Sequence, residues 1–333
     1  MTTKPPSNNF VAVMRKVYHP IGFSKGYNFT LWFILIGTLF GFSLSRLIYL
    51  DFDNRFCPEE SRGPNSAAPG ECYTYRTKPL YLIGIKLHLF TILPAALLVC
   101  FQFVPAIRHR LLLFHRINGY LVITLSLIGT VGALMIARVS FSGTIATQIV
   151  CGLLSIMFLG SMGIALYNIK MLQLEQHRAW MMRAWVYAAS IITTRFILIL
   201  SSVIISQLGS TSYYMAQPCH KLASMYSNST ELLLAYPTCR DSSAWAAVAA
   251  TMEGDEANVA AVQGMTFGAA VWLAVAIHAI GVEFYLTPAE ADRLRNISYQ
   301  RQLEAGFKDP GRGGLTADRI GDAEKWIPQS QRK

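Results

Sequence analysis

The sequence predicts an all-α, polytopic membrane protein with six transmembrane helices, the middle four of which form a central bundle. Of its 333 residues, 53% are hydrophobic and only 14% are charged, whereas soluble domains have about 25% charged residues. Six apolar stretches reach the roughly 20 residues that a spanning helix needs, and none alternates as a barrel strand would. This composition excludes a disordered protein and a small disulfide scaffold. The six stretches cover residues 29–50, 79–104, 113–137, 145–167, 184–207 and 263–286.

The segment before the first span is basic. Residues 1–28 contain Arg15, Lys16 and Lys25 and have no small-residue cleavage site after a short apolar core. The first span is therefore expected to be a retained signal anchor. The resulting organisation is an N-terminal segment of residues 1–28, a membrane domain of residues 29–286 and a polar tail of residues 287–333.

The charges of the short connecting segments predict the orientation. Residues 1–28, 105–116 and 168–183 together contain 10 Lys and Arg and a single acid, Glu175. The positive-inside rule places these segments, and with them both termini, in the cytosol. The net charge of +10 then reflects membrane topology. A nucleic-acid partner is not expected, because the basic residues flank apolar runs. The expected partner is the lipid bilayer.

The two long outer loops, residues 51–78 and 208–262, each contain two cysteines. Four thiols on one side of the membrane suit an oxidising lumen or exterior, which indicates a secretory-pathway or plasma membrane. Of three glycosylation sequons, only the one at Asn228 falls on this side, so Asn228 is the expected glycan site. The simplest cysteine pairing is one disulfide per loop, Cys57 with Cys72 and Cys219 with Cys239.

The last outer loop and the tail have contrasting compositions. The loop of residues 208–262 is too long for a mere connector. It is either a disulfide-tied cap with a solvated acidic edge at Glu253, Asp255 and Glu256 or a binding site. The tail from Thr287 is polar and rich in breakers, which predicts a short amphipathic piece followed by disorder.

Ionisable residues inside a membrane are costly, so they are the first candidates for function. His88 and Gln102 lie on one face of the second span, in a stripe of small residues. Close helix packing explains the small residues of such a stripe but not the histidine. Arg195 lies deep in the fifth span. It is either an interhelical hydrogen-bond anchor or a counter-charge for an anionic group. His88, Gln102 and Arg195 are therefore the candidates for contact with a substrate.

Two His-Arg pairs stand at the predicted cytosolic ends of outward-running spans. They are His115 with Arg116 on the third span and His177 with Arg178 before the fifth. Two imidazoles at matching depth can bind the iron of one haem b, and the arginines can pair with its propionates. Two alternatives remain: interfacial histidines that bind lipid head groups or backbone, and a pair that binds a metal or substrate.

The motifs of the middle spans resemble those of a known family. They are Lys86-Leu-His-Leu, Phe114-His-Arg-Ile-Asn-Gly, Glu175-Gln-His-Arg-Ala-Trp-Met-Met-Arg and Thr194-Arg. Over about residues 80–207 they resemble an uncharacterised family of microbial multi-pass membrane proteins, a domain of unknown function. The resemblance implies an architecture and little chemistry.

More distantly, the same four spans are similar to the ascorbate-reducible transmembrane b-type cytochromes. That likeness implies haem-mediated electron transfer, with ascorbate or a protein as electron donor. The fourth span, residues 145–167, contains no histidine, so a partner for His88 is missing. At most one bis-histidine haem is then expected, from His115 and His177. One haem does not easily bridge about 30 Å of hydrocarbon.

Two functions follow from these residues. The first is a haem-b redox enzyme or electron-transfer component that acts on a small or apolar metabolite. The second is a non-catalytic transporter or accessory protein of a biosynthetic pathway, and the sequence leaves open whether the protein is an enzyme. A cyclase or transferase is disfavoured because such chemistry needs acids inside the bundle, and the spans contain only Glu283, near a helix end.

Overall fold

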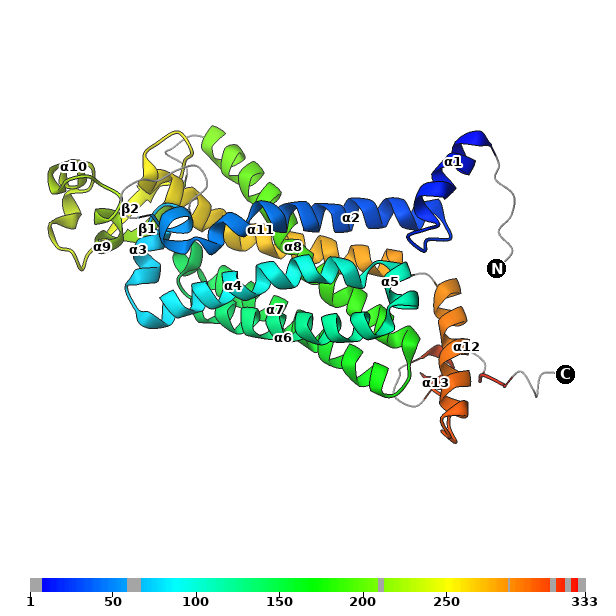
Figure 1. The fold of residues 1–333 in the computed structure, drawn as a ribbon. Coiled ribbons are helices and arrows are strands. Elements are labelled where there is room, and N and C mark those ends of the chain that lie inside the picture. Colours follow the sequence, from blue (N-terminus) through cyan, green and yellow to red (C-terminus); the bar gives the residue numbers. More distant parts are fainter. Residues whose placement is uncertain are drawn as a thin grey trace. The chain divides into compact units, whose positions relative to one another are not determined.

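Six helices of the structure, a computed structural model, are long and apolar enough to cross a membrane (Figure 1). The predicted six-span, all-α membrane architecture is therefore confirmed. The structure describes residues 8–58, 67–208, 213–286, 288–311, 316–320 and 325–328. The long helices are α2 (Gly26–Ser45), α4 (Pro79–Gln102), α6 (Leu112–Ile136), α7 (Ile145–Lys170), α8 (Leu174–Gln207) and α11 (Glu256–Tyr285).

Two of these helices begin well before the apolar runs that predicted them. Helix α8 begins at Leu174 rather than at residue 184, and α11 begins at Glu256 rather than at residue 263. Each carries a glutamate in its first turn, Glu175 in α8 and Glu256 in α11, where a negative charge complements the helix dipole. Hydropathy marks the part of a helix that suits lipid, whereas the helix itself continues into polar sequence.

Shorter elements connect the long helices. Prolines open α4 and α5 at the first helical position, where the missing N–H costs no hydrogen bond. The short elements are α1 (Asn9–Tyr18), η1 (Leu47–Leu50), η2 (Phe52–Phe56), α3 (Glu71–Arg76), α5 (Pro105–Arg110), η3 (Ser140–Gly143), β1 (Tyr214–Pro218), α9 (Cys219–Ala223), α10 (Ser229–Ala235), η4 (Pro237–Arg240), β2 (Trp245–Ala249), α12 (Pro288–Glu304) and α13 (Ala317–Ile320).

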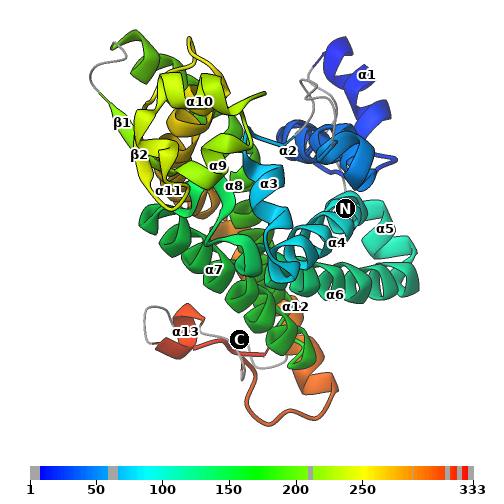
Figure 2. The ribbon, with the colours of Figure 1, turned by 90° about the vertical axis from the view of Figure 1, so that its left-hand side faces the viewer.

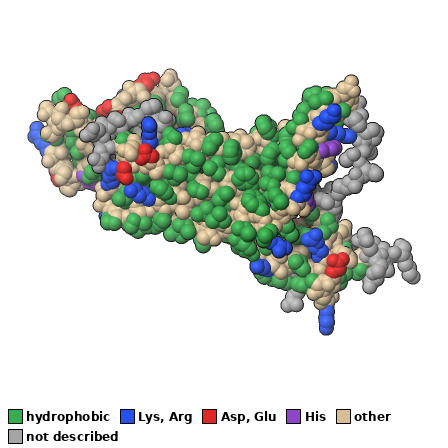
Figure 3. Space-filling model, viewed as in Figure 1, with side chains coloured by type: hydrophobic (Ala, Val, Ile, Leu, Met, Phe, Trp, Pro, Cys, Tyr) green, Lys and Arg blue, Asp and Glu red, His purple; other side chains and the backbone are tan. Residues whose placement is uncertain are grey.

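The contacts within the chain define two compact units, which are described separately. The first unit comprises Met1–Gln148 and Leu198–Gly268, and the second comprises Ile149–Ile197 and Ala269–Lys333. In the first unit, α4 and α6 pack along their lengths, and all three predicted outer loops belong to it. Figure 3 shows hydrophobic side chains along α2, α4 and α6, with charged side chains gathered toward the helix ends. This distribution suits helices that face lipid.

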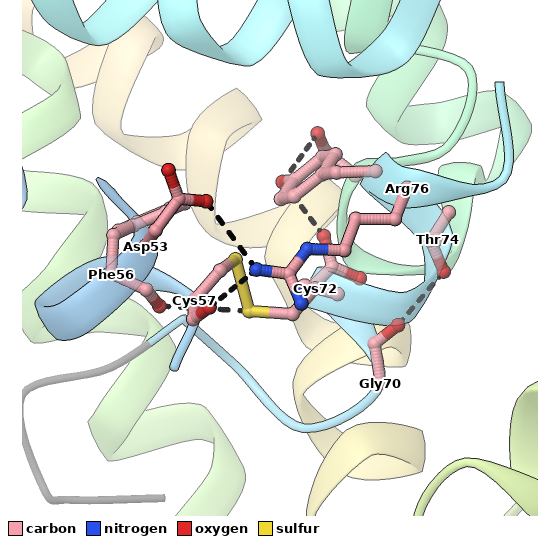
Figure 4. Close-up of a disulfide and its surroundings, with 10 residues drawn as sticks. Asp53, Phe56, Cys57, Gly70, Cys72, Thr74 and Arg76 are labelled. Atoms are coloured by element: carbon pink, nitrogen blue, oxygen red, sulfur yellow. Dashed lines mark hydrogen bonds and ion pairs between the residues drawn. A yellow bond between two sulfur atoms is a disulfide. The ribbon is translucent and has the colours of Figure 1, made fainter. Parts of the chain in front are cut away.

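The first outer loop is closed by the predicted disulfide between Cys57 and Cys72, whose Cα atoms lie 5.3 Å apart (Figure 4). Arg76, on the same loop, donates to the Cys57 carbonyl at 2.8 Å and pairs with Asp53 at 3.5 Å. Thr74 Oγ1 donates to the Gly70 carbonyl at 2.8 Å, a bond within the first turn of α3. The loop is therefore folded by local contacts around its covalent link.

The last outer loop contains the second predicted disulfide. Cys219 and Cys239 are bonded, with a Cα separation of 5.2 Å. Strands β1 and β2 pair antiparallel with Pro218 opposite Trp245, beside α9 and α10 (Figure 2). Both expected disulfides are therefore present, and Cys100 and Cys151 are free. The outer-loop residues 51–58, 67–78, 138–144 and 213–255 are called the cap below.

A buried ion pair joins the three loops of the cap. The side chains of Glu71 and Lys221 are only 3% and 6% exposed, and Lys221 Nζ lies 3.6 Å from Glu71 Oε1. The other carboxylate oxygen accepts hydrogen bonds from the Tyr75 hydroxyl at 2.9 Å and from the Phe141 backbone N–H at 3.0 Å. Lys221 Nζ also donates to Ser142 Oγ at 3.3 Å. A charge pair this buried persists only when its remaining donors and acceptors are bonded.

The acidic edge of the cap is partly engaged with aromatic residues. The hydroxyl of Tyr226 donates to Asp255, and burial followed by this bond raises the pKa of Tyr226. Asp255 Oδ1 also accepts from the Asn258 N–H at 3.1 Å, at the start of α11. Asp255, in the acidic run of residues 253–256, therefore links the cap to the start of α11.

In the second unit, the tail packs onto the segment before α8. Ser298 Oγ accepts from the Leu174 N–H at 2.9 Å, and Gln302 Nε2 donates to the Met171 carbonyl at 2.7 Å. Tyr299 is 1% exposed, and burial raises its pKa to about 12. Its hydroxyl bonds to Thr316 at 2.7 Å. Helix α12 occupies the place of the short amphipathic piece expected at the start of the tail, and Ser298 and Gln302 of this helix are buried. The disorder expected after it stays a prediction.

Candidate functional site

The stripe of small residues on α4 is a helix-packing surface. A Cβ atom at Gly132 of α6 would lie 2.6 Å from both the Gly84 carbonyl oxygen and the His88 backbone nitrogen. A Cβ atom at Gly84 would in turn lie 2.8 Å from the side chain of Met135. Only glycine permits this close approach of the two backbones. The glycines of the stripe are therefore explained by the close packing of α4 against α6.

The polar residues of the stripe form hydrogen bonds between α4 and α6. His88 Nδ1 lies 2.8 Å from the Gly129 carbonyl oxygen. Because a carbonyl only accepts, Nδ1 carries the proton. Gln102 Nε2 donates to the backbone carbonyl of His115 at 3.1 Å. Both candidate substrate residues thus face the neighbouring helix and satisfy its backbone.

Asn118 is a further residue of this interface that the sequence analysis missed. It is 4% exposed, and its Nδ2 donates to the Leu98 carbonyl at 3.0 Å. An asparagine one helical turn after His115 on an apolar helix was the available signal. The interface therefore carries three interhelical hydrogen bonds to backbone carbonyls among the described residues.

His115 and Arg116 stand in the first turn of α6, in the first unit. His115 is half-buried, while Arg116 is exposed. An exposed guanidinium at a helix end is placed to meet an anionic group from outside the bundle.

His177 and Arg178 stand in the first turns of α8, in the second unit. His177 Nδ1 lies 2.9 Å from the carbonyl oxygen of Ala165, on α7. This bond assigns the proton to Nδ1 and the lone pair to Nε2. Glu175 is 8% exposed and Arg178 is half-buried. The ring of His177 is therefore oriented by a backbone carbonyl, as metal-ligating histidines usually are.

Arg195 lies in the same unit as a hydrogen-bonded threonine–histidine pair. His278 Nδ1 donates to the Val186 carbonyl at 2.7 Å, and its Nε2 lies 2.8 Å from Thr193 Oγ1. Both nitrogens of His278 are thereby engaged between α8 and α11. Arg195 itself is half-buried.

The second unit also contains an ion pair that the sequence analysis did not predict. Arg183 forms a two-pronged contact with Glu283, through Nε to Oε1 at 2.6 Å and Nη2 to Oε2 at 2.7 Å. Glu283, the single acid noted in the spans, is thus the partner of an arginine near the start of α8. No group of three or more His, Cys, Asp or Glu side chains that could hold a metal ion occurs among the described residues.

Fold and site together define a polytopic α-helical membrane protein. Residues 85–223 match the model of a family described as "Predicted membrane protein (DUF2306)". This match confirms the resemblance to an uncharacterised membrane-protein family and extends it from residue 207 into the cap. No curated protein and no solved structure matches the chain. These comparisons give no support to the likeness to the b-type cytochromes.

Proposed function

We propose that the protein is a membrane-embedded haem-b redox component, for which His115 and His177, each in its own unit, would supply ligands to haem iron. The observation that supports the proposal best is the hydrogen bond from His177 Nδ1 to the Ala165 carbonyl, because it orients the ring and leaves the lone pair on Nε2. His115 and His177 belong to different units, and each has its own surroundings.

The neighbouring residues suit the same group. Arg116 and Arg178 would pair with the haem propionates, and Arg195 would supply a counter-charge within the bundle. Haem, when bound, supplies one-electron transfer. A single haem on the cytosolic side suits oxidation or reduction of a small or apolar metabolite there. The electron donor would be ascorbate or a donor protein.

An absorption spectrum of the detergent-purified full chain tests the proposal. We expect a Soret band and sharp α-bands after dithionite reduction, which are lost in separate His115→Ala and His177→Ala variants. His278→Ala is the matched control, because both of its ring nitrogens are hydrogen-bonded and its loss should leave the spectrum intact. Full haem in the first two variants, or a featureless wild-type spectrum, contradicts the redox function.

A second function, a non-catalytic transporter or accessory protein, is favoured by one observation. His88 and Gln102 donate to backbone carbonyls across the α4–α6 interface, which is a structural use of polar side chains. The spectrum of the wild-type chain separates the two functions, because only the haem protein has a Soret band. His88→Ala should lower stability in either case, since it removes the hydrogen bond to the Gly129 carbonyl.

We also propose a secretory-pathway or plasma-membrane location with both termini in the cytosol. The 10-to-1 excess of basic residues in the short inner segments supports this orientation. Asn228 is exposed at the start of α10, where its Oδ1 accepts from the Glu231 N–H at 2.9 Å. If Asn228 carries a glycan, glycosidase treatment should increase the electrophoretic mobility of the protein. Asn228→Gln should abolish this change in mobility. If a reporter fused to the C-terminus is modified by lumenal enzymes, the proposed orientation is wrong.

A further inference from the structure

The cap contains a pocket at the ends of α4 and α6. Its volume is about 240 Å³, slightly below the roughly 300–1,000 Å³ of sites for drug-sized ligands. The described residues that line it come from all three loops of the cap, and all of them belong to the first unit. The size suits a small metabolite.

The charged side chains of the pocket leave a net positive charge. The lining residues include Arg138 and Lys221 and no aspartate or glutamate. Lys221 is already paired with Glu71, 3.6 Å away. Arg138 is exposed, and within the described part of the chain it has no carboxylate partner. A ligand in the pocket therefore meets one guanidinium whose charge no described carboxylate balances, which favours an anion.

A buried amide supplies a second and independent indication of a ligand. Gln217 lines the pocket and is 0% exposed, and its Nε2 donates to Ser142 Oγ at 3.0 Å. Its Oε1 is buried and has no hydrogen-bond partner among the described residues. A buried acceptor without a partner is costly, so such groups are almost always bonded. A donor on a ligand in the pocket could supply this partner.

The walls of the pocket are apolar and aromatic. Tyr81, Pro218 and Trp245 contribute to them, and Trp245 is 63% exposed. Flat rings and proline suit the apolar body of a ligand whose ends are polar.

Both disulfides stabilise the segments that line the pocket. Cys72 immediately precedes the lining residue Tyr73, and Cys219 immediately precedes His220. One disulfide thus fixes the lining segment that begins at Tyr73, and the other fixes the segment around His220. The buried Glu71–Lys221 pair joins these two segments. A site held in this way is preorganised for a ligand.

We propose that the cap pocket binds a small organic carboxylate that also carries a hydroxyl group. The carboxylate is bound by Arg138, the hydroxyl donates to Gln217 Oε1, and the apolar body lies against Trp245 and Tyr81. This site is separate from the proposed haem ligands, so its test is independent of theirs.

Equilibrium dialysis of the oxidised full chain in detergent against para-hydroxybenzoate tests the proposal. We expect saturable binding with a dissociation constant between about 10 µM and 1 mM. Arg138→Gln should weaken binding about tenfold or more, because it removes a charge-assisted hydrogen bond. Arg240→Gln is the matched control: an exposed arginine of the same cap, outside the pocket, whose loss should leave affinity unchanged.

Two further measurements address the second end of the ligand and the frame of the pocket. Gln217→Leu should weaken binding of para-hydroxybenzoate more than binding of benzoate, since benzoate has no hydroxyl. Reduction of the disulfides should weaken binding of both. Absence of saturable binding to the wild-type protein, equal affinity in Arg138→Gln, or equal binding of the neutral para-hydroxybenzamide would each overturn the proposal.

Discussion

The cap of the first unit and the tail of the second unit are stabilised by different kinds of contact. The cap has two disulfides and a charge pair whose side chains are 3% and 6% exposed. The tail is held by hydrogen bonds of Ser298, Tyr299 and Gln302 and by the ion pairs Arg295–Asp318 and Arg319–Asp309, and its sequence contains no cysteine. In the proposed orientation the cap faces an oxidising compartment and the tail a reducing one, where disulfides do not persist. The difference shows how each compartment limits the contacts available to a polar segment.

The largest expected effect comes from breaking the buried pair of the cap. Lys221→Met leaves Glu71 buried without its counter-charge, which should destabilise the cap by about 3–5 kcal/mol. Thermal denaturation in detergent and proteolysis of the cap measure the loss. The double variant with Glu71→Gln should recover part of it, because no unpaired charge remains. If Lys221→Met leaves the thermal stability of the cap unchanged, the pair does not stabilise the cap.

Removal of either disulfide should have the next largest effect. The bonds close separations of 15 and 20 residues, and each contributes about 3 kcal/mol by lowering the chain entropy of the unfolded state. Cys57→Ser with Cys72→Ser, and separately Cys219→Ser with Cys239→Ser, should lower the melting temperature of the cap. Protease release of the tail should not change. Before reduction, thiol labelling of the denatured wild-type protein should find only Cys100 and Cys151.

A smaller effect is expected at the centre of the tail contact. Gln302 is 0% exposed and bonds to the Met171 carbonyl at 2.7 Å and to the Gly311 N–H at 2.6 Å. Gln302→Ala should cost about 1–3 kcal/mol, because these backbone groups lose their partner, and trypsin should then release the tail faster. Gln300→Ala is the control, since Gln300 is exposed and bonds only within α12 to Glu304. Equal release in both variants would mean that Gln302 does not hold the tail.

The smallest effect is expected at the ion pair of the second unit. The Glu283 side chain is 52% exposed, so its attraction to Arg183 is screened far more than that of the buried pair in the cap. Arg183→Lys keeps the charge but loses the two-pronged geometry, and should cost less than about 1 kcal/mol. A melting temperature that falls as far as in Lys221→Met would remove the distinction between buried and exposed pairs.

Much of the fold follows from short-range patterns in the sequence. Apolar runs of about 20 residues were enough to predict six helices. The two disulfides could be predicted because each of the two long loops contains two cysteines. The beginning of α8 at Leu174 was missed because hydropathy reports the lipid-compatible part of a helix and not its polar extension. The packing of the tail onto the segment before α8 was not predicted, since the composition of a polar helix does not show which segment it will contact.

The contacts that build the sites were mostly outside the reach of the sequence. Glu71, Lys221 and Gln217 were not singled out from the sequence, because their partners lie on other loops. His88 was found as a polar residue in an apolar run, yet its bond to the Gly129 carbonyl depends on which helices pack together. The ligand roles of His115 and His177 remain a prediction from their matching positions.

The Glu71–Lys221 pair also constrains the order in which the protein is made. Glu71 leaves the ribosome with the first outer loop, and its disulfide can close at once with local partners. Lys221 is synthesised only after the fifth span, so the carboxylate must stay hydrated or protonated while four further spans insert. The cap then closes as a late event that reports complete insertion of the preceding helices. A chain stalled before this point would expose an incomplete cap, with Glu71 still lacking its counter-charge.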